Sequence, residues 1–356
     1  MRIAQVSPLY ESVPPQGYGG TERVVSYLTE ELVKSGHQVT LFASGDSVTR
    51  AELVPCCARS LRLDETCKDP LAHHMVMIER ALERADEFDL IHFHTDYLHF
   101  SVARRLAVAH LTTLHGRLDT PELHSVFTQF SDVPLASISD AQRKPVAHAN
   151  FCGTVQHGLP LDLYPFRAEP DDYFAFLGRI SPEKRLDRAI EIARRLGVRL
   201  KVAAKLDRAD RDYYEQEIAH LMSDPVVDFV GEIGEQQKAE FLGRARCLLF
   251  PIDWPEPFGL VMIESMACGT PVVAFRCGSV PEVIDDGVSG YCVDDLDSAT
   301  TAAARALELD RRACRDAFDR RFSVERMARD YVGLYAELVE RNRRRSGEQF
   351  PSEVAA

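Results

Sequence analysis

The sequence predicts an α/β protein made of two doubly wound domains, each with a mainly parallel sheet. Short apolar runs rich in Val, Ile and Phe alternate with longer segments of helical period, a pattern typical of βαβ units. This alternation occurs twice along the 356 residues, and that length by itself suggests two domains. A solenoid is excluded because no short repeat is present.

The first half contains six expected strands and one especially clear helix. The helix runs from Thr21 to Ser35, because apolar residues recur there every four positions and Gly36 follows as a left-handed stop. The strands are expected at Ile3 to Val6, Gln38 to Ala43, Leu90 to His94, Leu111 to Leu114, Leu135 to Ile138 and Gly153 to Gln156.

The second half repeats the pattern after a segment that breaks regular structure. The glycine and prolines of His157 to Pro165 place a domain boundary there, and Leu186 to Leu196 is the most secure helix, ended by Gly197. We expect domains at residues 1–160 and 161–322, a helix at 323–345 that packs back on the first domain, and a tail at 346–356. Strands are expected at Tyr173 to Leu177, Leu200 to Ala204, Val226 to Val230, Cys247 to Phe250 and Val272 to Phe275.

Composition limits the partners and the compartment. The 55 acidic residues outnumber the 42 Lys and Arg, and a formal charge of -13 argues against binding to a nucleic-acid backbone. No run approaches the ~20 apolar residues that span a bilayer, and no signal peptide is evident. The nine cysteines include no C-x-x-C pair, so we expect free thiols and a cytoplasmic location. The Arg343 to Arg345 cluster leaves a weak peripheral membrane contact open, although a solvated tail is favoured.

The most informative segment runs from Pro251 to Pro271. A helix is expected to start near Pro257, so that the backbone N-H groups of Phe258, Gly259 and Leu260 offer an anion site. Two acidic residues, Glu256 and Glu264, are eight positions apart, which corresponds to roughly 12 Å of helix and mildly disfavours a glycosidase pair. The apolar helix start leaves Glu264 little solvent, so this carboxylate needs a ligand or a partner.

A second candidate site follows the first strand of the second domain. Arg179 and Lys184 lie five residues apart in a turn, where Arg179 can grip phosphate oxygens and Lys184 can act as a point charge. Both would stabilise a diphosphate leaving group. Without further context, a solvated basic turn paired with Glu183 or Asp187 is an equal alternative.

Two loops of the first domain also carry candidate residues. Gly19 and Gly20 lie between the first strand and the first helix, but Glu22 replaces the third glycine of a dinucleotide fingerprint, which argues against an NAD enzyme. His115 follows a strand and is expected at the edge of the cleft. His92 and His94 share one strand face, but a metal site is disfavoured because no fourth ligand lies at an ordinary spacing.

Together these motifs resemble the family 4 retaining glycosyltransferases, which have the GT-B fold of two Rossmann-like domains facing a central cleft. The resemblance covers most of the chain and depends on the Glu256 to Glu264 spacing, the run through Cys268-Gly269-Thr270-Pro271 and the Gly178-Arg179 to Lys184 segment. The departure is Ala203-Ala204-Lys205, where many members carry a glycine-rich turn.

The resemblance implies a role for each candidate. Glu256 and His115 would act at the donor sugar, Glu264 would bind the ribose hydroxyls, and the turn around Ile233 would line the nucleobase pocket. The donor-binding set is then Gly19, Gly20, Arg179, Lys184, Ile233, Phe258, Gly259, Leu260 and Glu264.

We therefore expect transfer of a hexose or related sugar from a UDP- or GDP-linked donor to an unknown acceptor hydroxyl, with no cofactor and no obligatory metal. A GT-B sugar-nucleotide epimerase and a non-catalytic nucleotide-binding protein remain alternatives.

Overall fold

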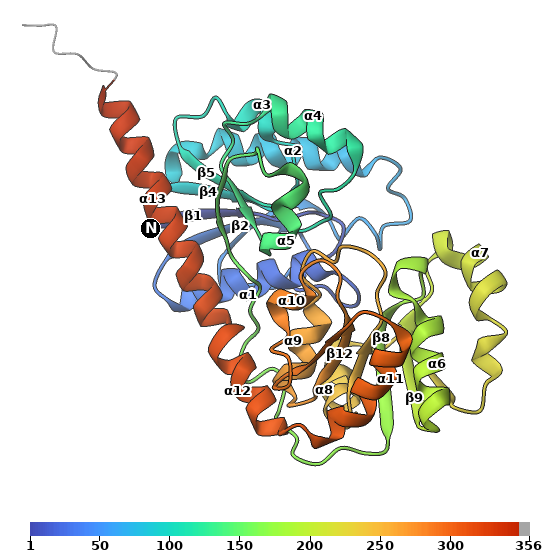
Figure 1. Ribbon diagram of the computed structural model, residues 1–356. Coiled ribbons are helices and arrows are strands. Elements are labelled where there is room, and N and C mark those ends of the chain that lie inside the picture. The colour runs from blue at the N-terminus through green and yellow to red at the C-terminus, as the bar shows by residue number, and fades with distance from the viewer. Residues whose placement is uncertain (349–356) are drawn as a thin grey trace, which may run out of the picture. The chain divides into compact units, whose positions relative to one another are not determined.

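The computed structural model describes residues 1–348, with side chains as far as residue 344. The chain forms two compact units (Figure 1). Unit 1 contains Met1–Ile138, Arg143–Gln156 and the chain from Val324 onward, and unit 2 contains Ser139–Gln142 and His157–Ser323. Each unit has its own sheet and its own apolar core.

Unit 1 is built on a seven-stranded sheet in which every paired strand is parallel, in the order β3-β2-β1-β4-β5-β6-β7. Ile3 of β1 lies opposite Val39 on one side and Leu90 on the other. The strands are β1 (Arg2–Val6), β2 (Gln38–Ser44), β3 (Glu52–Cys57), β4 (Leu90–Phe93), β5 (Ala109–Thr113), β6 (Leu135–Ser137) and β7 (Phe151–Thr154).

The helices of unit 1 include the last one in the chain. α13 (Val324–Glu348) packs against α1 and β5 (Figure 1), which confirms that the C-terminal helix returns to the N-terminal domain. Residues 346–348, expected to begin a tail, continue this helix, and 349–356 lie outside the described residues. The other helices are α1 (Gly20–Lys34), α2 (Pro70–Glu83), α3 (Phe100–Ala103) and α4 (Pro121–Gln129). The short α5 (Asp140–Arg143) belongs to unit 2 except for Arg143.

Unit 2 is a six-stranded parallel sheet in the order β10-β9-β8-β11-β12-β13. Its strands are β8 (Tyr173–Arg179), β9 (Arg199–Lys205), β10 (Val227–Gly231), β11 (Leu248–Phe250), β12 (Val272–Phe275) and β13 (Gly290–Val293). Its helices are α6 (Leu186–Leu196), α7 (Arg211–Tyr213), α8 (Glu235–Gly243), α9 (Leu260–Ala267), α10 (Val280–Val283), α11 (Leu296–Arg305) and α12 (Arg311–Arg321).

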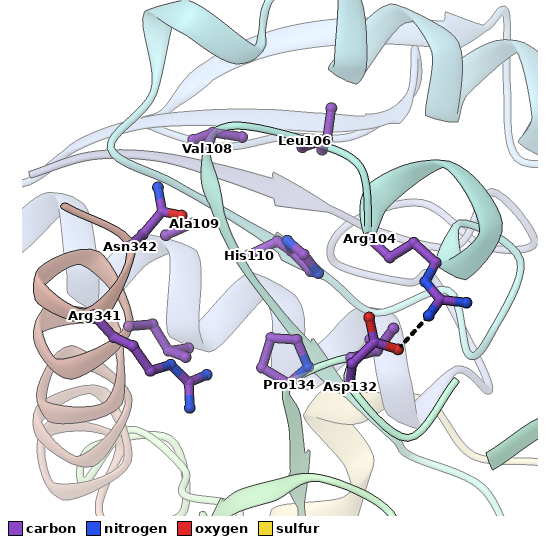
Figure 2. Close-up of a pocket in the computed structure, with 11 residues that line it drawn as sticks. Arg104, Leu106, Val108, Ala109, His110, Asp132, Pro134, Arg341 and Asn342 are labelled. Carbon is purple, nitrogen blue, oxygen red and sulfur yellow. Dashed lines mark ion pairs between the residues drawn. The ribbon is translucent and has the colours of Figure 1, made fainter. Parts of the chain in front are cut away.

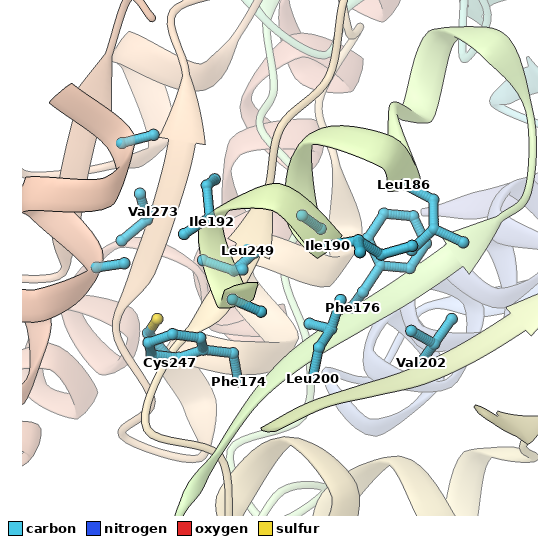
Figure 3. Close-up of a cluster of buried hydrophobic side chains, with 14 of the residues drawn as sticks. Phe174, Phe176, Leu186, Ile190, Ile192, Leu200, Val202, Cys247, Leu249 and Val273 are labelled. Carbon is cyan, nitrogen blue, oxygen red and sulfur yellow. The ribbon is translucent and has the colours of Figure 1, made fainter. Parts of the chain in front are cut away.

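The core of unit 2 lies between α6 and its sheet. Phe174 and Phe176 of β8 converge with Leu200 of β9 and Ile190 of α6, and all four side chains are at most 3% exposed (Figure 3). Burial of one such side chain contributes roughly 1.5–3 kcal/mol relative to leaving it exposed. The core therefore holds α6 against the strand that carries Arg179 at its end.

Strand order in both sheets reverses beside the first strand of the unit. In unit 2, β8 is flanked by β9 on one side and by β11 on the other, so the loops after β8 and β11 leave neighbouring strand ends in opposite directions. Ligands of open α/β sheets bind at such a point, outside the carboxyl ends of the strands. The loops that carry Arg179, Lys184 and Glu256 follow these two strands.

Two edge strands were not predicted from the sequence. β3 contains Pro55, which suits an edge strand because its missing N-H costs no ladder bond there, but it hides the apolar pattern. β13 begins at Gly290, where an added Cβ would lie 1.9 Å from the carbonyl oxygen of Val272. The strands that were predicted are all present, with ends that differ by up to two residues.

A pocket of unit 1 lies at the amino end of β5, away from the loops that carry the candidate residues. Figure 2 shows Arg104 paired with Asp132 on one side and Arg341 with Asn342 of α13 on the other. His110, the second residue of β5, also lines this pocket. It is therefore distinct from the strand ends at which we expect the chemistry.

The remaining expectations concern the basic cluster near the end of the chain, a membrane-spanning helix and the state of the cysteines. Arg343 and Arg344 are exposed on α13, and Arg344 pairs with Glu340, whereas the side chain of Arg345 is outside the described residues. None of the helices in residues 1–348 combines the length and apolar character needed to cross a membrane. All nine cysteines are free thiols.

Two buried arginines of α12 hold the segment that opens unit 2. Arg311 donates to the carbonyl oxygens of Arg167, Gly243 and Ala245 and to the hydroxyl of Thr270, at 2.7–2.9 Å. Arg315 donates to the carbonyls of Leu161, Tyr164 and Ala267 at 2.6–2.7 Å. The guanidinium groups thus donate hydrogen bonds to loop carbonyls that no helix or sheet pairs and that burial would otherwise leave without a donor.

We predict that Arg311→Met lowers the free energy of unfolding by about 3 kcal/mol or more, because several buried acceptors lose their donor together. Urea unfolding followed by circular dichroism measures the change. Arg320→Met, an exposed arginine of the same helix, is the control, with an expected change within about 0.5 kcal/mol. Equal effects of the two substitutions would contradict the assignment.

Candidate active-site residues

The turn after β8 presents its two cations at the carboxyl edge of the sheet of unit 2. β8 ends at Arg179, a short 3-10 turn covers Pro182–Lys184, and Arg185 takes a left-handed conformation with φ of 53° before α6 begins. The backbone N-H of Asp253, in the loop after β11, donates to the carbonyl of Glu183 at 2.9 Å. The loops after the two adjacent strands are therefore joined directly.

Carboxylates surround Arg179. Its guanidinium pairs closely with Glu183 and lies 3.5 Å from Asp207 and 3.9 Å from Asp210. Burial alone would raise the pKa of Glu183, but backbone and Ser181 hydrogen bonds and the Arg179 charge hold it below its usual value. Burial raises the pKa of Asp210. Pairing with Glu183 matches the alternative for this turn, and it places a competitor beside any anion that Arg179 would bind.

Lys184 contacts the loop after β11. Its ammonium lies 2.5 Å from Glu256 Oε2 and above the rings of Phe250 and Trp254, at 5.4 and 5.0 Å from their centroids. The indole N-H of Trp254 donates to the same carboxylate oxygen at 3.0 Å. Lys184 and Glu256, which are 72 residues apart in the chain, are thus brought together, and only 9% of Glu256 is exposed.

The loop that carries Glu256 is tightly supported by a neighbouring glycine. The backbone N-H of Ser279 donates to the Glu256 carbonyl at 3.0 Å. An added Cβ on Gly278, whose φ is +56°, would lie 2.3 Å from that carbonyl oxygen. Only glycine fits such a close backbone approach, so Gly278 helps to fix the position of Glu256.

The helix after this loop starts later than expected. α9 begins at Leu260, not near Pro257, because Gly259 adopts a left-handed φ of 78° and occupies the N-cap. No side chain caps this helix start, so its first backbone N-H groups point out of the helix without a side-chain acceptor. Phe258 is 2% exposed, and its carbonyl accepts from the Ser279 hydroxyl at 2.9 Å.

Glu264 is buried in α9, as expected, and it has a partner within the chain. Lys238 of α8 donates to Glu264 Oε1 at 2.9 Å and lies 3.3 Å from Glu235. Glu264 is 3% exposed. Lys238 was not predicted from the sequence, because nothing local to a polar stretch of α8 indicates which buried charge it meets. Ile233, half-buried, follows β10 after Gly231, whose φ is 80°.

A short segment from the first half of the sequence belongs to unit 2. The hydroxyl of Ser139 donates to the carbonyl of Pro257 at 2.7 Å, beside Glu256. The backbone N-H groups of Asp140 and Ala141 donate to Glu282 at 2.8 and 2.6 Å. Sequence reasoning missed this contact, which supports the Glu256 loop from residues far away in the chain.

The glycine loop of unit 1 leads into α1. Gly19 is the N-cap and Gly20 the first residue, one position earlier than predicted. An added Cβ on Gly19 would lie 2.8 Å from Pro15 Cβ. Arg23 folds back so that its guanidinium donates to the Gly17 carbonyl at 2.8 Å. This arginine was not a sequence candidate, although it is a cation beside the loop.

His115 lies two residues beyond β5, at the carboxyl edge of the unit 1 sheet. Its Nε2 lies 2.9 Å from His94 Nδ1. Burial lowers the pKa of His115 to about 3, so its imidazole is neutral at pH 7. It can therefore accept or donate a hydrogen bond there, but it does not supply an acidic proton.

His92 and His94, considered as metal ligands in the sequence, lie within a hydrogen-bonded cluster. His92 contacts Tyr335 and Thr113, each at 2.7 Å, and His94 contacts Gln5 at 2.7 Å. In the described part of the chain, no three His, Cys, Asp or Glu side chains are grouped so that they could hold a metal.

Comparison with known proteins gives the family. A model described as Glycosyltransferase Family 4 matches residues 18–150, and one described as Glycosyl transferases group 1 matches residues 165–320. The D-inositol 3-phosphate glycosyltransferase of Mycolicibacterium smegmatis is 34% identical over a segment that covers 43% of this chain and only 34% of that relative. The enzyme of the same name from Thermobifida fusca is 27% identical, over 83% of this chain and 82% of its own.

A solved structure agrees with the fold. Alr3699/HepE of Anabaena, in complex with UDP and glucose, superposes with a TM-score of 0.73 over 95% of this chain and 100% of its own, at 18% identity. That identity speaks for the fold alone. Because the two family models together match most of the chain and the two sheets are those of paired Rossmann-like units, the chain belongs to glycosyltransferase family 4 and has the GT-B fold.

Proposed function

We propose that this protein transfers a hexose or related sugar from a UDP- or GDP-linked donor to an acceptor hydroxyl, with retention of the anomeric configuration. The observation that carries the proposal is the contact between the loops after β8 and β11, in which Lys184 meets Glu256. In this proposal the donor binds where the strand order of unit 2 reverses. Its contacts are the cations Arg179 and Lys184, the start of α9, and the buried carboxylates Glu256 and Glu264.

The donor diphosphate would bind to groups of unit 2. Arg179 and Lys184 supply positive charge, and the N-H groups of Phe258, Gly259 and Leu260 supply donors at the start of α9. Glu264 would bind the ribose hydroxyls, and the turn at Ile233 would contact the base. A solved neighbour named in complex with UDP and glucose supports a uridine nucleotide as the first to test.

The transfer exchanges one bond at the anomeric carbon. Its bond to the diphosphate oxygen breaks, the acceptor oxygen bonds from the same face, and the acceptor proton passes to the departing diphosphate. Arg179, Lys184 and the N-H groups of α9 stabilise the charge that develops on this leaving group. Glu256 binds the sugar and gives electrostatic support, and no side chain forms a covalent intermediate.

His115 contacts the donor sugar in this proposal, and the Gly19-Gly20 loop lies near donor phosphate and acceptor, as the family resemblance implies. Because the pKa of His115 is lowered to about 3, its contribution is a hydrogen bond. The chain itself supplies the cations that a diphosphate needs, so we propose that no metal is obligatory.

We predict that Lys184→Ala lowers kcat/KM for transfer by roughly 10²- to 10³-fold, because one charge on the leaving group is lost. The assay incubates a panel of UDP- and GDP-sugars with and without a crude acceptor extract and measures UDP or GDP release. Arg199→Ala is the matched control, since Arg199 is exposed at the amino end of β9. Circular dichroism checks that both variants fold.

The same assay separates the alternatives. Isomerised donor without acceptor-dependent release would indicate an epimerase, and binding without turnover would indicate a non-catalytic protein. Unchanged transfer by a folded Lys184→Ala variant would contradict the assignment of the diphosphate site.

We predict that the product has the same anomeric configuration as the donor sugar. The one-bond carbon-hydrogen coupling at the anomeric centre, measured by NMR on donor and product, reports this configuration directly. An inverted product would leave sugar transfer standing but would refute the same-face mechanism.

A third expectation concerns metal. We predict that EDTA changes the initial rate by less than about twofold, because Arg179 and Lys184 meet the diphosphate charge that a divalent ion would otherwise neutralise. Loss of activity with EDTA and its recovery with Mg²⁺ or Mn²⁺ would contradict this prediction.

A further inference from the structure

The turn after β8 and the loop after β11 are joined by more than the pair of Lys184 and Glu256. Asp253, three residues before Glu256, binds the turn on both sides of Lys184. Its backbone N-H donates to the carbonyl of Glu183 at 2.9 Å, and its Oδ2 accepts from Arg185 Nη1 at 2.7 Å. These two contacts form the Asp253 bracket around Lys184.

Asp187 sets the direction of the Arg185 guanidinium. Its carboxylate accepts from Arg185 Nε at 2.9 Å and from Nη2 at 2.7 Å, so one edge of the planar group is held by two hydrogen bonds. The remaining nitrogen, Nη1, is the one that donates to Asp253. The direction of these contacts is fixed, because a guanidinium can only donate and an ionised carboxylate can only accept.

The backbone of Arg185 is held in a conformation that arginine rarely adopts. Its φ of 53° is left-handed, and among the described residues only Asp96 shares a positive φ without being glycine. Such a conformation costs free energy and persists where the surroundings hold it, whereas glycine adopts it without strain. What arginine adds at this position is the guanidinium that reaches the second loop.

A second arginine supports the same carboxylate from the first turn of α6. Arg188 Nη2 donates to Asp253 Oδ2 at 3.0 Å, and its Nη1 donates to the carbonyls of Pro251 and Ile252 at 3.4 and 3.5 Å. The guanidinium also lies 4.7 Å from the ring centroid of Phe275 in β12. The carboxylate of Asp253 is therefore held from two sides, although 51% of this side chain is exposed.

We propose that Arg185 and Asp253 are positioning residues that hold Lys184 and Glu256 in one fixed arrangement. The inference rests on the proposed function for the chemistry that Lys184 and Glu256 perform. A partly exposed ion pair adds little to stability, so we expect the bracket to act on the geometry of the site more than on unfolding. Groups displaced by about 1 Å from a reacting centre can lose about 100-fold in rate.

The competing explanation is a purely local ion pair. Arg185 and Asp187 are two residues apart, and their contact by itself would only stabilise the start of α6. A local pair predicts that substitution of Asp253 does not reproduce the effect of substituting Arg185. The bracket predicts the same effect from both substitutions, because each removes the contact between the two loops.

Trp254 allows a test without any substrate. It is the only tryptophan of the chain, it follows Asp253 directly, and its indole N-H donates to Glu256. Acrylamide quenching of its fluorescence therefore reports how firmly the loop after β11 is held. In Arg185→Gly we expect the quenching constant to rise by about twofold at an unchanged urea midpoint, because glycine accepts the left-handed φ. We expect a similar rise in Asp253→Asn, which keeps the backbone N-H.

The same variants are compared in the transfer assay. In Arg185→Gly and Asp253→Asn we expect kcat to fall by about tenfold to 100-fold with donor KM within about threefold, because Lys184 and Glu256 remain but are no longer aligned. The double variant should lose at most about twofold more than the worse single variant, since both substitutions remove one contact. Losses that multiply would assign the two residues independent roles and would overturn the inference.

Arg195→Ala is the matched control. Arg195 lies at the other end of α6 and also joins two carboxylates, those of Glu191 at 2.8 Å and Asp297 at 2.7 Å. We expect wild-type quenching and wild-type kcat from this variant. Wild-type quenching in Arg185→Gly, or an equal change in Arg195→Ala, would refute the bracket. If no nucleotide sugar is transferred, the proposed function fails while the quenching still tests the bracket, so the two failures are distinguishable.

Discussion

Parallel strand pairing is the constraint on which the rest of this structure depends. Parallel neighbours require a crossover after every strand, so all carboxyl ends of a sheet lie at one edge. In unit 2 the order reverses between β8 and β11, and the loops after these two strands therefore start side by side. Lys184 and Glu256 meet because of this topology, although 72 residues separate them. The joined backbones of Glu183 and Asp253 show that the contact involves more than two flexible side chains.

The second theme is the balance of charge at that edge. An acidic chain with a net charge of -13 repels polyanions, yet it places Arg179 and Lys184 together. Each of these cations is paired with a carboxylate of the chain, Glu183 or Glu256, and Lys238 meets the buried Glu264 in the same way. A diphosphate would have to compete for these cations. The pairing reduces the free-energy cost of placing these charges in a partly buried site. The binding of an anion there depends on the position of the neighbouring carboxylates as well as on the number of basic residues.

The sequence predicted the fold well where periodicity is local and complete. Helix α6 ended at Gly197 as expected, and the strands of both sheets except β3 and β13 were found. The start of α9 was misplaced because proline at 257 favours a first turn, whereas the left-handed Gly259 delays it to Leu260. The candidate residues Arg179, Lys184 and Glu256 came from motifs. Lys238, Ser139 and Gly278 did not, because their importance lies in contacts with residues 26 to 118 positions away or in a backbone approach that no local pattern encodes.

The histidines of unit 1 show that a local sequence pattern can also suggest the wrong kind of partner. In the sequence, His92 and His94 were considered as two metal ligands, because alternate residues of a strand share a face. Their partners are instead Gln5 and Tyr335, 330 residues apart, brought together when α13 returns to pack against β5. Buried imidazoles need a partner on each nitrogen, and a metal is only one way to provide it. Here His92 contacts the phenol of Tyr335 and the hydroxyl of Thr113, and His94 contacts the amide of Gln5 and the ring of His115. The last helix of the chain therefore supplies a partner to a histidine of the unit 1 sheet that no local sequence pattern could have indicated.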